Sequence, residues 1–310
     1  MRAPATSKKR SKLGAYNRRD ILFYIALMAF PVLQFTVFYI VVNANSILLT
    51  FRSYDTMTGT VSWVGFENLK EAFRMMTQQL ELLDAMKNSF LAYLITLVIG
   101  TPLALLFSFY IYKKLPASGI FRVLLFMPSI ISAIVMVTIF QFFSDRAVPE
   151  IITKVFGVET IQGLIENPDT RFGTVMFYNI FVGFGTATLM YSNAMDGISP
   201  DLVDAAKLEG AVGIKEFVYI TFPMIFPTFS TFFITGVATI FTNQYNLYSF
   251  FGDGSSIQTY GYWLYVKVAG AASQSEYPVL AAVGILLTVI AVPLTLIVKK
   301  LLEKFGPSED

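Results

Sequence analysis

The chain has 310 residues, of which 55% are hydrophobic and only 14% are charged, and its formal net charge is +2. Soluble domains carry about 25% charged residues, so this composition excludes an ordinary soluble domain and indicates a membrane protein. The absence of cysteine excludes disulfides and thiolate metal sites, the absence of histidine removes the commonest general base, and the small net charge gives no reason to expect nucleic acid as a partner.

The first twenty residues are polar and basic, and we predict that residues 1–20 form a cytoplasmic tail. An apolar run from Ile21 to Val42 follows, and clustered cations beside a first span hold that end of a chain in the cytoplasm. The run is too long for the core of a signal peptide, and no small-residue cleavage site follows it closely. We therefore expect a retained first span.

Six segments contain the roughly twenty predominantly apolar residues that a transmembrane helix needs. They are Ile21 to Val42, Asn88 to Tyr112, Phe121 to Phe143, Phe172 to Met195, Met224 to Leu247, and Val279 to Val298. Basic residues follow the second, fourth and sixth spans, whereas the segment between the third and fourth is acidic. With the first end inside, every basic segment falls inside. The pattern predicts an all-α membrane protein with six transmembrane helices in residues 21–305, a tail at 306–310, and both termini cytoplasmic.

The first predicted extracytoplasmic segment, residues 43–87, contains the run Trp63-Val64-Gly65-Phe66-Glu67-Asn68-Leu69. Gly65 predicts a turn, and Asn68 predicts the cap of a helix from about Leu69 to Met86. The pattern fits an interfacial helix without a partner as well as it fits a partner-binding segment.

A polar segment between the fourth and fifth spans, residues 199–216, has the chemistry of a short helix. Ser199 suits the N-cap, Pro200 suits the first helical position, and Gly210 can close the helix in a left-handed conformation. One face of this helix carries Leu202, Ala205, Ala206 and Glu209, at positions i, i+3, i+4 and i+7. A helix of about ten residues is marginal alone in water, so we expect it to pack on its own membrane domain or on another protein.

This segment resembles the EAA loop of bacterial ABC importer permeases, whose pattern is Glu-Ala-Ala, two residues, Asp-Gly-Ala, then a Phe, an Ile and two prolines. The matching residues are Asp204-Ala205-Ala206, Lys207-Leu208, Glu209-Gly210-Ala211, Phe217, Ile220, Pro223 and Pro227. Asp204 replaces Glu and Glu209 replaces Asp, and both substitutions keep the charge. The Trp63 run is similar to a Phe/Trp-Val-Gly-Leu-x-Asn-Tyr motif of carbohydrate permeases of the maltose and glycerol-phosphate F/A type, with Leu69 in place of Tyr. The resemblance runs from about Trp63 to Phe305.

The resemblance implies the type I ABC importer permease fold, in which the EAA loop is a coupling helix that inserts into a cytoplasmic ATPase. The coupling residues that it implies are Leu202, Asp204, Ala205, Ala206, Glu209, Gly210 and Ala211. It also implies a second homologous permease subunit, two cytoplasmic ATPase subunits and an extracytoplasmic solute-binding protein, in a bacterial cytoplasmic membrane. Such an ATPase uses ATP and magnesium, so we expect this chain itself to bind no cofactor.

The residue types within the spans narrow the chemistry. The stretch from Gly210 to Glu216 lacks the spacing and the final Ser or Thr of a Walker A loop, so we expect no ATP hydrolysis by this chain. Apart from Arg122 near an interface, the predicted spans lack the interior charges that ion-coupled carriers usually keep. Neutral polar side chains remain, and the candidate solute contacts are Gln141, Asn179, Asn243, Gln244, Tyr245, Asn246 and Tyr248. For any single one of them, an interhelical hydrogen bond is the simpler explanation.

These patterns and the resemblance together favour a permease subunit that imports a carbohydrate, since amides and phenols hydrogen-bond hydroxyl groups and aromatic faces stack on sugar rings. Three alternatives remain open at this point. They are an ABC importer permease for a non-sugar solute such as a peptide or polyamine, an ion-coupled secondary carrier, and a membrane scaffold or receptor that transports nothing.

Overall fold

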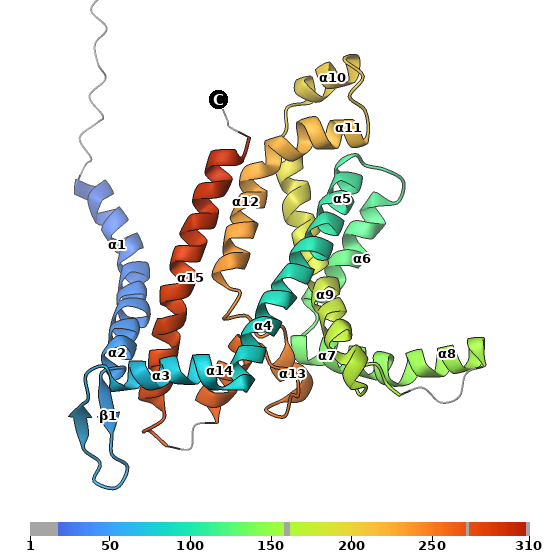
Figure 1. The fold of residues 1–310 in the computed structure, drawn as a ribbon. Coiled ribbons are helices and arrows are strands. Elements are labelled where there is room, and N and C mark those ends of the chain that lie inside the picture. The colour runs from blue at the N-terminus through green and yellow to red at the C-terminus, as the bar shows by residue number, and fades with distance from the viewer. Residues whose placement is uncertain (1–17, 158–161, 271–272, 308–310) are drawn as a thin grey trace, which may run out of the picture.

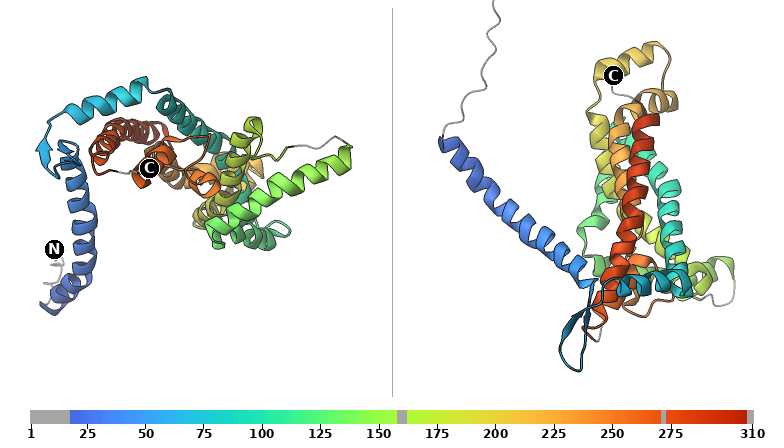
Figure 2. Two further views of the ribbon diagram at one scale, coloured as in Figure 1. Left: turned by 90° about the horizontal axis from the view of Figure 1, so that it is seen from below. Right: turned by 60° about the vertical axis from the view of Figure 1, so that its left-hand side comes forward.

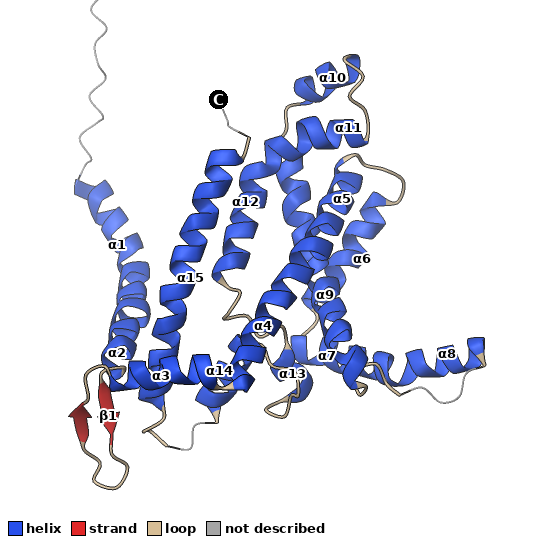
Figure 3. Cartoon of the chain, in the orientation of Figure 1, coloured by secondary structure: helices blue, strands red, loops and turns tan. Residues whose placement is uncertain are grey.

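The computed structural model describes residues 18–157, 162–270 and 273–307. Within these residues the chain is almost entirely helical, and one two-stranded hairpin is the exception (Figure 3). The all-α prediction is therefore confirmed. Most of the predicted tail at residues 1–20 and the end of the tail at 306–310 lie outside the described residues.

Five helices are long and apolar enough to cross a membrane, and the described ranges also hold one bent pair of helices that makes a sixth if its two halves are counted as one span. The straight spans are Ile21–Leu49, Leu80–Tyr112, Pro168–Asp196, Ile214–Ala238 and Tyr277–Phe305. They overlap five of the six predicted segments, although the fifth begins and ends earlier than predicted and the others are longer.

The spans are assembled from the following helices. The first contains α1 (Arg18–Phe35), the π-helical segment η1 (Thr36–Val41) and α2 (Val42–Leu49). The second contains α4 (Leu80–Ile95), the π-helical segment η2 (Thr96–Gly100) and α5 (Thr101–Tyr112). The fourth span is the single helix α9 (Pro168–Asp196), and the sixth is the single helix α15 (Tyr277–Phe305). The fifth contains α11 (Ile214–Glu216), the π-helical segment η4 (Phe217–Thr221) and α12 (Phe222–Ala238).

The third span is not the straight helix that its apolar run predicts. It consists of α6 (Ser118–Ile130) and a second helix formed by α7 (Ala133–Phe142), the π-helical η3 (Phe143–Ala147) and α8 (Val148–Phe156). The two helices meet at an angle of 105°. The break falls at Ile131 and Ser132, whose ψ angles of 143° and 135° are those of extended backbone. Pro128, which has no backbone N–H, weakens the last turn of α6 just before it.

The two ends of the bundle carry different elements (Figure 1). The start of α1, the end of α15 and the short helix α10 (Pro200–Leu208) lie at one end. The opposite end carries the hairpin of β1 (Arg52–Tyr54) and β2 (Val61–Trp63), α3 (Glu67–Gln78), α8, α13 (Leu247–Phe251) and α14 (Tyr260–Ala269). The first span stands apart from the other spans over most of its length (Figure 2), and no residue of its most apolar stretch is buried.

The segment 43–87 differs in detail from the prediction. Gly65 forms the expected turn, with a φ of 60° that favours glycine. Asn68, however, does not cap a helix, because α3 already begins at Glu67 and the amide of Asn68 donates to the carbonyl oxygens of Thr50 and Arg52, at 2.8 Å each. The predicted single helix is also broken at Gln79, whose ψ of 115° separates α3 from α4.

Two groups of buried side chains position the functional region. The first, nearer α10, joins α5, α9, α10 and α12 through Ala104, Leu105, Phe109, Tyr191, Met195, Ile198, Val203 and Ile225. The second, at the opposite end, includes Val137, Phe140, Val175, Tyr178, Tyr245, Leu247, Phe250 and Tyr262. The first group therefore fixes α5, α9 and α12 against one another near α10, and the second holds α9 against α7, α13 and α14 at the opposite end.

Candidate functional site

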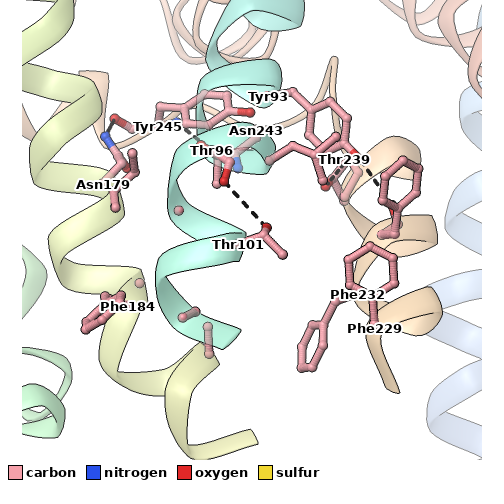
Figure 4. Close-up of a pocket in the computed structure, with 18 of the residues that line it drawn as sticks. Tyr93, Thr96, Thr101, Asn179, Phe184, Phe229, Phe232, Thr239, Asn243 and Tyr245 are labelled. Atoms are coloured by element: carbon pink, nitrogen blue, oxygen red, sulfur yellow. Dashed lines mark hydrogen bonds between the residues drawn. The ribbon is translucent and has the colours of Figure 1, made fainter. Parts of the chain in front are cut away.

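A cavity of about 240 Å³ lies between the spans and is bounded by α4, η2, α5, α9 and α12 (Figure 4). Its polar lining residues are Tyr93, Thr96, Thr101, Asn179, Tyr191, Thr239, Asn243 and Tyr245, and its phenylalanines are Phe184, Phe229, Phe232 and Phe233. None of the residues that line it carries a charge. Its walls therefore offer aromatic faces, hydroxyl groups and amides to a solute.

The hydroxyl groups of the threonines are held on the helix walls. Thr96 Oγ1 donates to the carbonyl oxygen of Ala92 at 2.9 Å, and Thr239 Oγ1 donates to that of Thr235 at 3.0 Å. A threonine hydroxyl has one donor and two acceptor sites, so each keeps its acceptor capacity for a ligand. Tyr93 crosses from α4 to α12, where its Oη donates to the carbonyl oxygen of Phe233 at 3.3 Å.

Asn179 and Tyr245 close the end of the cavity that lies away from α10. The Nδ2 group of Asn179 donates to the carbonyl oxygens of Val175 and Tyr245, at 2.8 Å each, and its Oδ1 accepts a hydrogen bond from Nδ2 of Asn246 at 2.8 Å. Asn179 therefore has its partners within the protein and ties α9 to the segment that follows α12.

That segment corrects the predicted fifth span, which we expected to run as a helix to Leu247. The helix ends at Ala238, and the chain then turns without helical structure until α13. Tyr245 and Asn246 have positive φ angles of 49° and 58°, which are uncommon for residues other than glycine and are often found at functional sites. The side-chain oxygen of Asn243 accepts a hydrogen bond from the backbone N–H of Tyr245 at 2.8 Å and supports this turn.

The structure divides the predicted solute contacts into two groups. Asn179, Asn243 and Tyr245 line the cavity, and Asn246 supports Asn179 from behind. Gln141, Gln244 and Tyr248 do not line it. Gln141 donates to the carbonyl oxygen of Phe250 at 2.9 Å, and the ring of Tyr248 packs edge-on against Tyr265 with centroids 4.8 Å apart. For Gln141, the interhelical hydrogen bond that we weighed from sequence is the arrangement present.

Most of the cavity wall was not foreseen from sequence. Tyr93, Thr96, Thr101, Phe184 and Phe229 lie in uniformly apolar runs, where no polar stripe separates an inward-facing from a lipid-facing position. The threonines and tyrosines in the second and fifth spans were the available signal, because hydroxyl groups in lipid-embedded helices usually face protein or water.

The predicted short helix is present as α10, at the end of the bundle that also holds the start of α1 and the end of α15 (Figure 1). Ser199 occupies the N-cap position, but its side chain makes no capping hydrogen bond, and Pro200 is the first helical residue. Gly210 closes the helix with a φ of 82°. The N–H groups of Gly210 and Ala211 donate to the carbonyl oxygens of Lys207 and Ala206, at 3.0 and 2.9 Å, which is the Schellman arrangement.

The residues of α10 divide into a buried and an exposed face. Val203 and Ala206 pack onto the bundle, so Ala206 is separated from the three residues with which the spacing grouped it on one face. Leu202, Ala205 and Glu209 are exposed, and Leu208 has 90% of its surface exposed.

Asp204 and Lys207 form an exposed ion pair at 2.7 Å, and this hydrogen bond holds the pKa of the Asp204 carboxyl below its ordinary value. The outer face of α10 is therefore partly apolar and bordered by charges.

Comparison of the sequence with known protein families identifies the family of this chain. Residues 96–308, more than half of the chain, match the family described as the binding-protein-dependent transport system inner membrane component. The chain belongs to this family. The resemblance found in the EAA segment is thereby confirmed, and the chain is a multi-pass inner-membrane permease of a transport system that depends on a binding protein.

Curated permeases share limited identity with this chain over much of its length. The probable ABC transporter permease protein YesP of Bacillus subtilis is 28% identical over 231 residues, covering 73% of this chain and 70% of YesP. The arabinooligosaccharides permease AraP of the same organism is 26% identical and covers 97% of this chain and 95% of AraP. The galactooligosaccharides permease GanP of the same organism is 25% identical over 81% of this chain, which spans only 63% of GanP.

A solved structure has the same fold as this permease. A chain of a bacterial alginate ABC transporter, crystallised in complex with an alginate pentasaccharide-bound periplasmic protein, aligns with a TM-score of 0.73. The alignment covers 93% of this chain and 96% of that chain at 19% sequence identity. The predicted type I ABC importer permease fold is thereby confirmed.

Proposed function

We propose that this permease forms half of the import pathway for a neutral oligosaccharide and is driven by separate ATPase subunits that bind α10. It pairs with a second, homologous permease, and two ATPases lie at the cytoplasmic face. The termini and α10 are cytoplasmic in this proposal, and the hairpin, α3 and α14 face the binding protein outside. ATP and magnesium are bound by the ATPases and not by this chain.

One observation carries the proposal: the spans that line the uncharged cavity lead directly to α10, whose outer face is exposed. Leu208 at the end of α10 is 90% exposed, and Val212 and Ile214 just after it are 63% and 66% exposed. Burying such apolar side chains against another protein is favourable, at about 25 cal/mol per Å² of apolar surface. A partner that covers α10 could therefore act on the cavity walls.

The carbohydrate assignment rests on the cavity lining and on the relatives. Aromatic rings and neutral hydrogen-bonding groups suit the hydroxyl-rich, uncharged surface of a sugar, and AraP and GanP are described as oligosaccharide permeases. The structurally similar transporter was solved with alginate, an acidic polysaccharide, bound to its periplasmic protein. The cavity of the present chain offers no cation to balance such acidic groups, and this favours a neutral sugar.

The proposal is tested by rebuilding the complete transporter, with both permeases, the ATPases and the binding protein, in proteoliposomes. We expect uptake of neutral oligosaccharides that requires ATP and the binding protein and that is insensitive to ionophores. Uptake that an ionophore abolishes, and that continues without ATP, would instead identify an ion-coupled carrier. The variant Ala205→Arg changes the exposed face of α10, so it should abolish ATPase association, whereas Gln78→Arg on the exposed surface of α3 should not.

A further inference from the structure

A buried ion pair joins the second span to the start of the fifth. Both carboxylate oxygens of Glu216 accept hydrogen bonds from Nζ of Lys113, at 2.7 and 2.8 Å. The Glu216 side chain is 1% exposed and that of Lys113 is 24% exposed. Removing one partner of such a pair leaves an uncompensated buried charge, so the two residues depend on each other.

The position of each residue suits its charge. Lys113 follows the last residue of α5, where a cation interacts favourably with the helix dipole. Glu216 lies in the first turn of the continuous fifth span, Ile214–Ala238, where an anion is favoured. The ammonium group of Lys113 also lies 5.8 and 5.7 Å from the ring centroids of Phe109 and Tyr112. These contacts fix the lysine at the end of its own helix.

Open space lies directly beside the pair. A cleft of about 300 Å³ separates α10 from the ends of α5 and α9, and Lys113 lies on its wall. The charged groups facing this cleft are Lys113, Lys114, Asp196, Asp204 and Lys207. Phe109, whose ring lies 5.8 Å from Nζ of Lys113, belongs to the buried group at the α10 end of the bundle and does not line the cleft. The pair therefore lies between the water-accessible side of α10 and the packed core.

The helices that the pair joins are also two walls of the cavity. Thr101 and Ala104 of α5 line it on one side, and Phe229, Phe232 and Gly236 of α12 line it on the other. Only seven residues separate Leu208, the last residue of α10, from Glu216. A displacement of α10 therefore reaches Glu216 through a short connection and α5 through Lys113.

We propose that the Lys113–Glu216 ion pair is the link that makes α5 and α12 move together when a partner displaces α10. The inference rests on the proposed function and adds two positioning residues to it. Neither residue contacts the solute; they determine how ATPase movement at α10 is converted into movement of the cavity walls. Without the pair, α10 still docks, but the second span no longer follows the fifth.

The test replaces the pair by neutral residues of similar size, in the variant Lys113→Met/Glu216→Gln. Replacing both partners removes the buried charges together, and such neutral replacements are often tolerated or even stabilising. The conservative variant Lys113→Arg keeps the ion pair. The matched control is Lys154→Met/Glu150→Gln, which removes an exposed Lys–Glu pair of similar length, 2.6 Å, on α8.

The measurements are the solute imported per ATP hydrolysed and the thermal unfolding midpoint of the assembled transporter. We expect the neutral pair to keep the unfolding midpoint and ATP hydrolysis while the solute imported per ATP falls about tenfold, within the usual range of coupling between sites. Lys113→Arg and the α8 control should keep the wild-type ratio. If the neutral pair unfolds early, Lys113→Gln/Glu216→Gln, which also removes both charges and keeps a hydrogen-bonding side chain at each position, carries the same expectation.

The outcomes separate this inference from the proposed function. A neutral-pair variant that imports solute with the wild-type ratio overturns the role of the ion pair while leaving ATP-driven import intact. A wild-type assembly that shows no import dependent on ATP and the binding protein overturns both. A tenfold loss that Lys113→Arg does not share supports the link.

Discussion

Gly236 lies where the ring of Tyr93 crosses α12 at the wall of the cavity. A Cβ atom at Gly236 would come within 2.7 Å of Cε2 of Tyr93, which is too close unless the Tyr93 ring or the helix moves. The neighbour is the ring of a side chain and not backbone, so the helix can stay in place if the ring shifts. Glycine at this position is therefore required by the tyrosine and not by the backbone.

We predict that Gly236→Ala reduces solute uptake without unfolding the protein. Alanine favours a helix over glycine by roughly 0.5–1 kcal/mol, which offsets the strain of moving Tyr93. The displaced ring occupies the cavity and should weaken uptake several-fold. Solute uptake and the thermal unfolding midpoint should be measured together. Gly284→Ala is the control, because Gly284 lies in α15 with nothing within 4 Å of the added methyl group.

At the scale of elements, α6 and α9 approach each other through a glycine. A Cβ atom at Gly185 of α9 would lie 1.8 Å from the carbonyl oxygen of Leu125 in α6. Small residues allow such close backbone contact between membrane helices, and there the attraction comes from packing. The short α6, which breaks at Ile131, therefore depends on Gly185 for its position against the bundle.

Gly185→Ala should destabilise the bundle, because two backbones must separate to accommodate the methyl group. Overpacking of this kind costs about 1–3 kcal/mol and occasionally more. We expect a lower thermal unfolding midpoint in detergent. The control lies two residues away on the same helix: at Gly183 an added Cβ atom has no neighbour within 4 Å, so Gly183→Ala should leave the midpoint nearly unchanged. Equal effects of the two substitutions would contradict the close contact.

At the scale of the whole molecule, hydropathy was sufficient to place five of the spans in order and to mark the apolar run of the bent pair, because it depends on runs of about twenty residues. Finer features depend on contacts between distant segments. The break at Ile131 falls inside an apolar run that hydropathy cannot distinguish from a straight span, and helix is lost after Ala238, before the polar residues at 242–246 begin. The outer turn at Tyr245 is held by Asn179, 66 residues earlier in the chain.

For the candidate site too, the sequence was sufficient to locate the main parts but not to show how they contact one another. The EAA pattern was sufficient to locate α10, and the amides at Asn179 and Asn243 pointed to the cavity. The face of α10 that packs inward could not be predicted, because helical spacing groups Ala206 with Leu202, Ala205 and Glu209 but does not say which of them meets the bundle. The pairing of Lys113 with Glu216 had no sequence signal, since each residue only marked the edge of a different span.

The orientation of the bundle can be tested directly because the chain contains no cysteine, so that each single-cysteine variant carries one thiol. Met57 in the hairpin is 95% exposed and Leu208 in α10 is 90% exposed, and they lie at opposite ends of the bundle (Figure 1). With α10 cytoplasmic, a membrane-impermeant thiol reagent should label Met57→Cys in right-side-out vesicles and Leu208→Cys in inside-out vesicles. Gln78→Cys on α3 should follow Met57→Cys. The reverse pattern would place α10 outside, beyond the reach of any cytoplasmic ATPase, and would overturn the proposed drive for import.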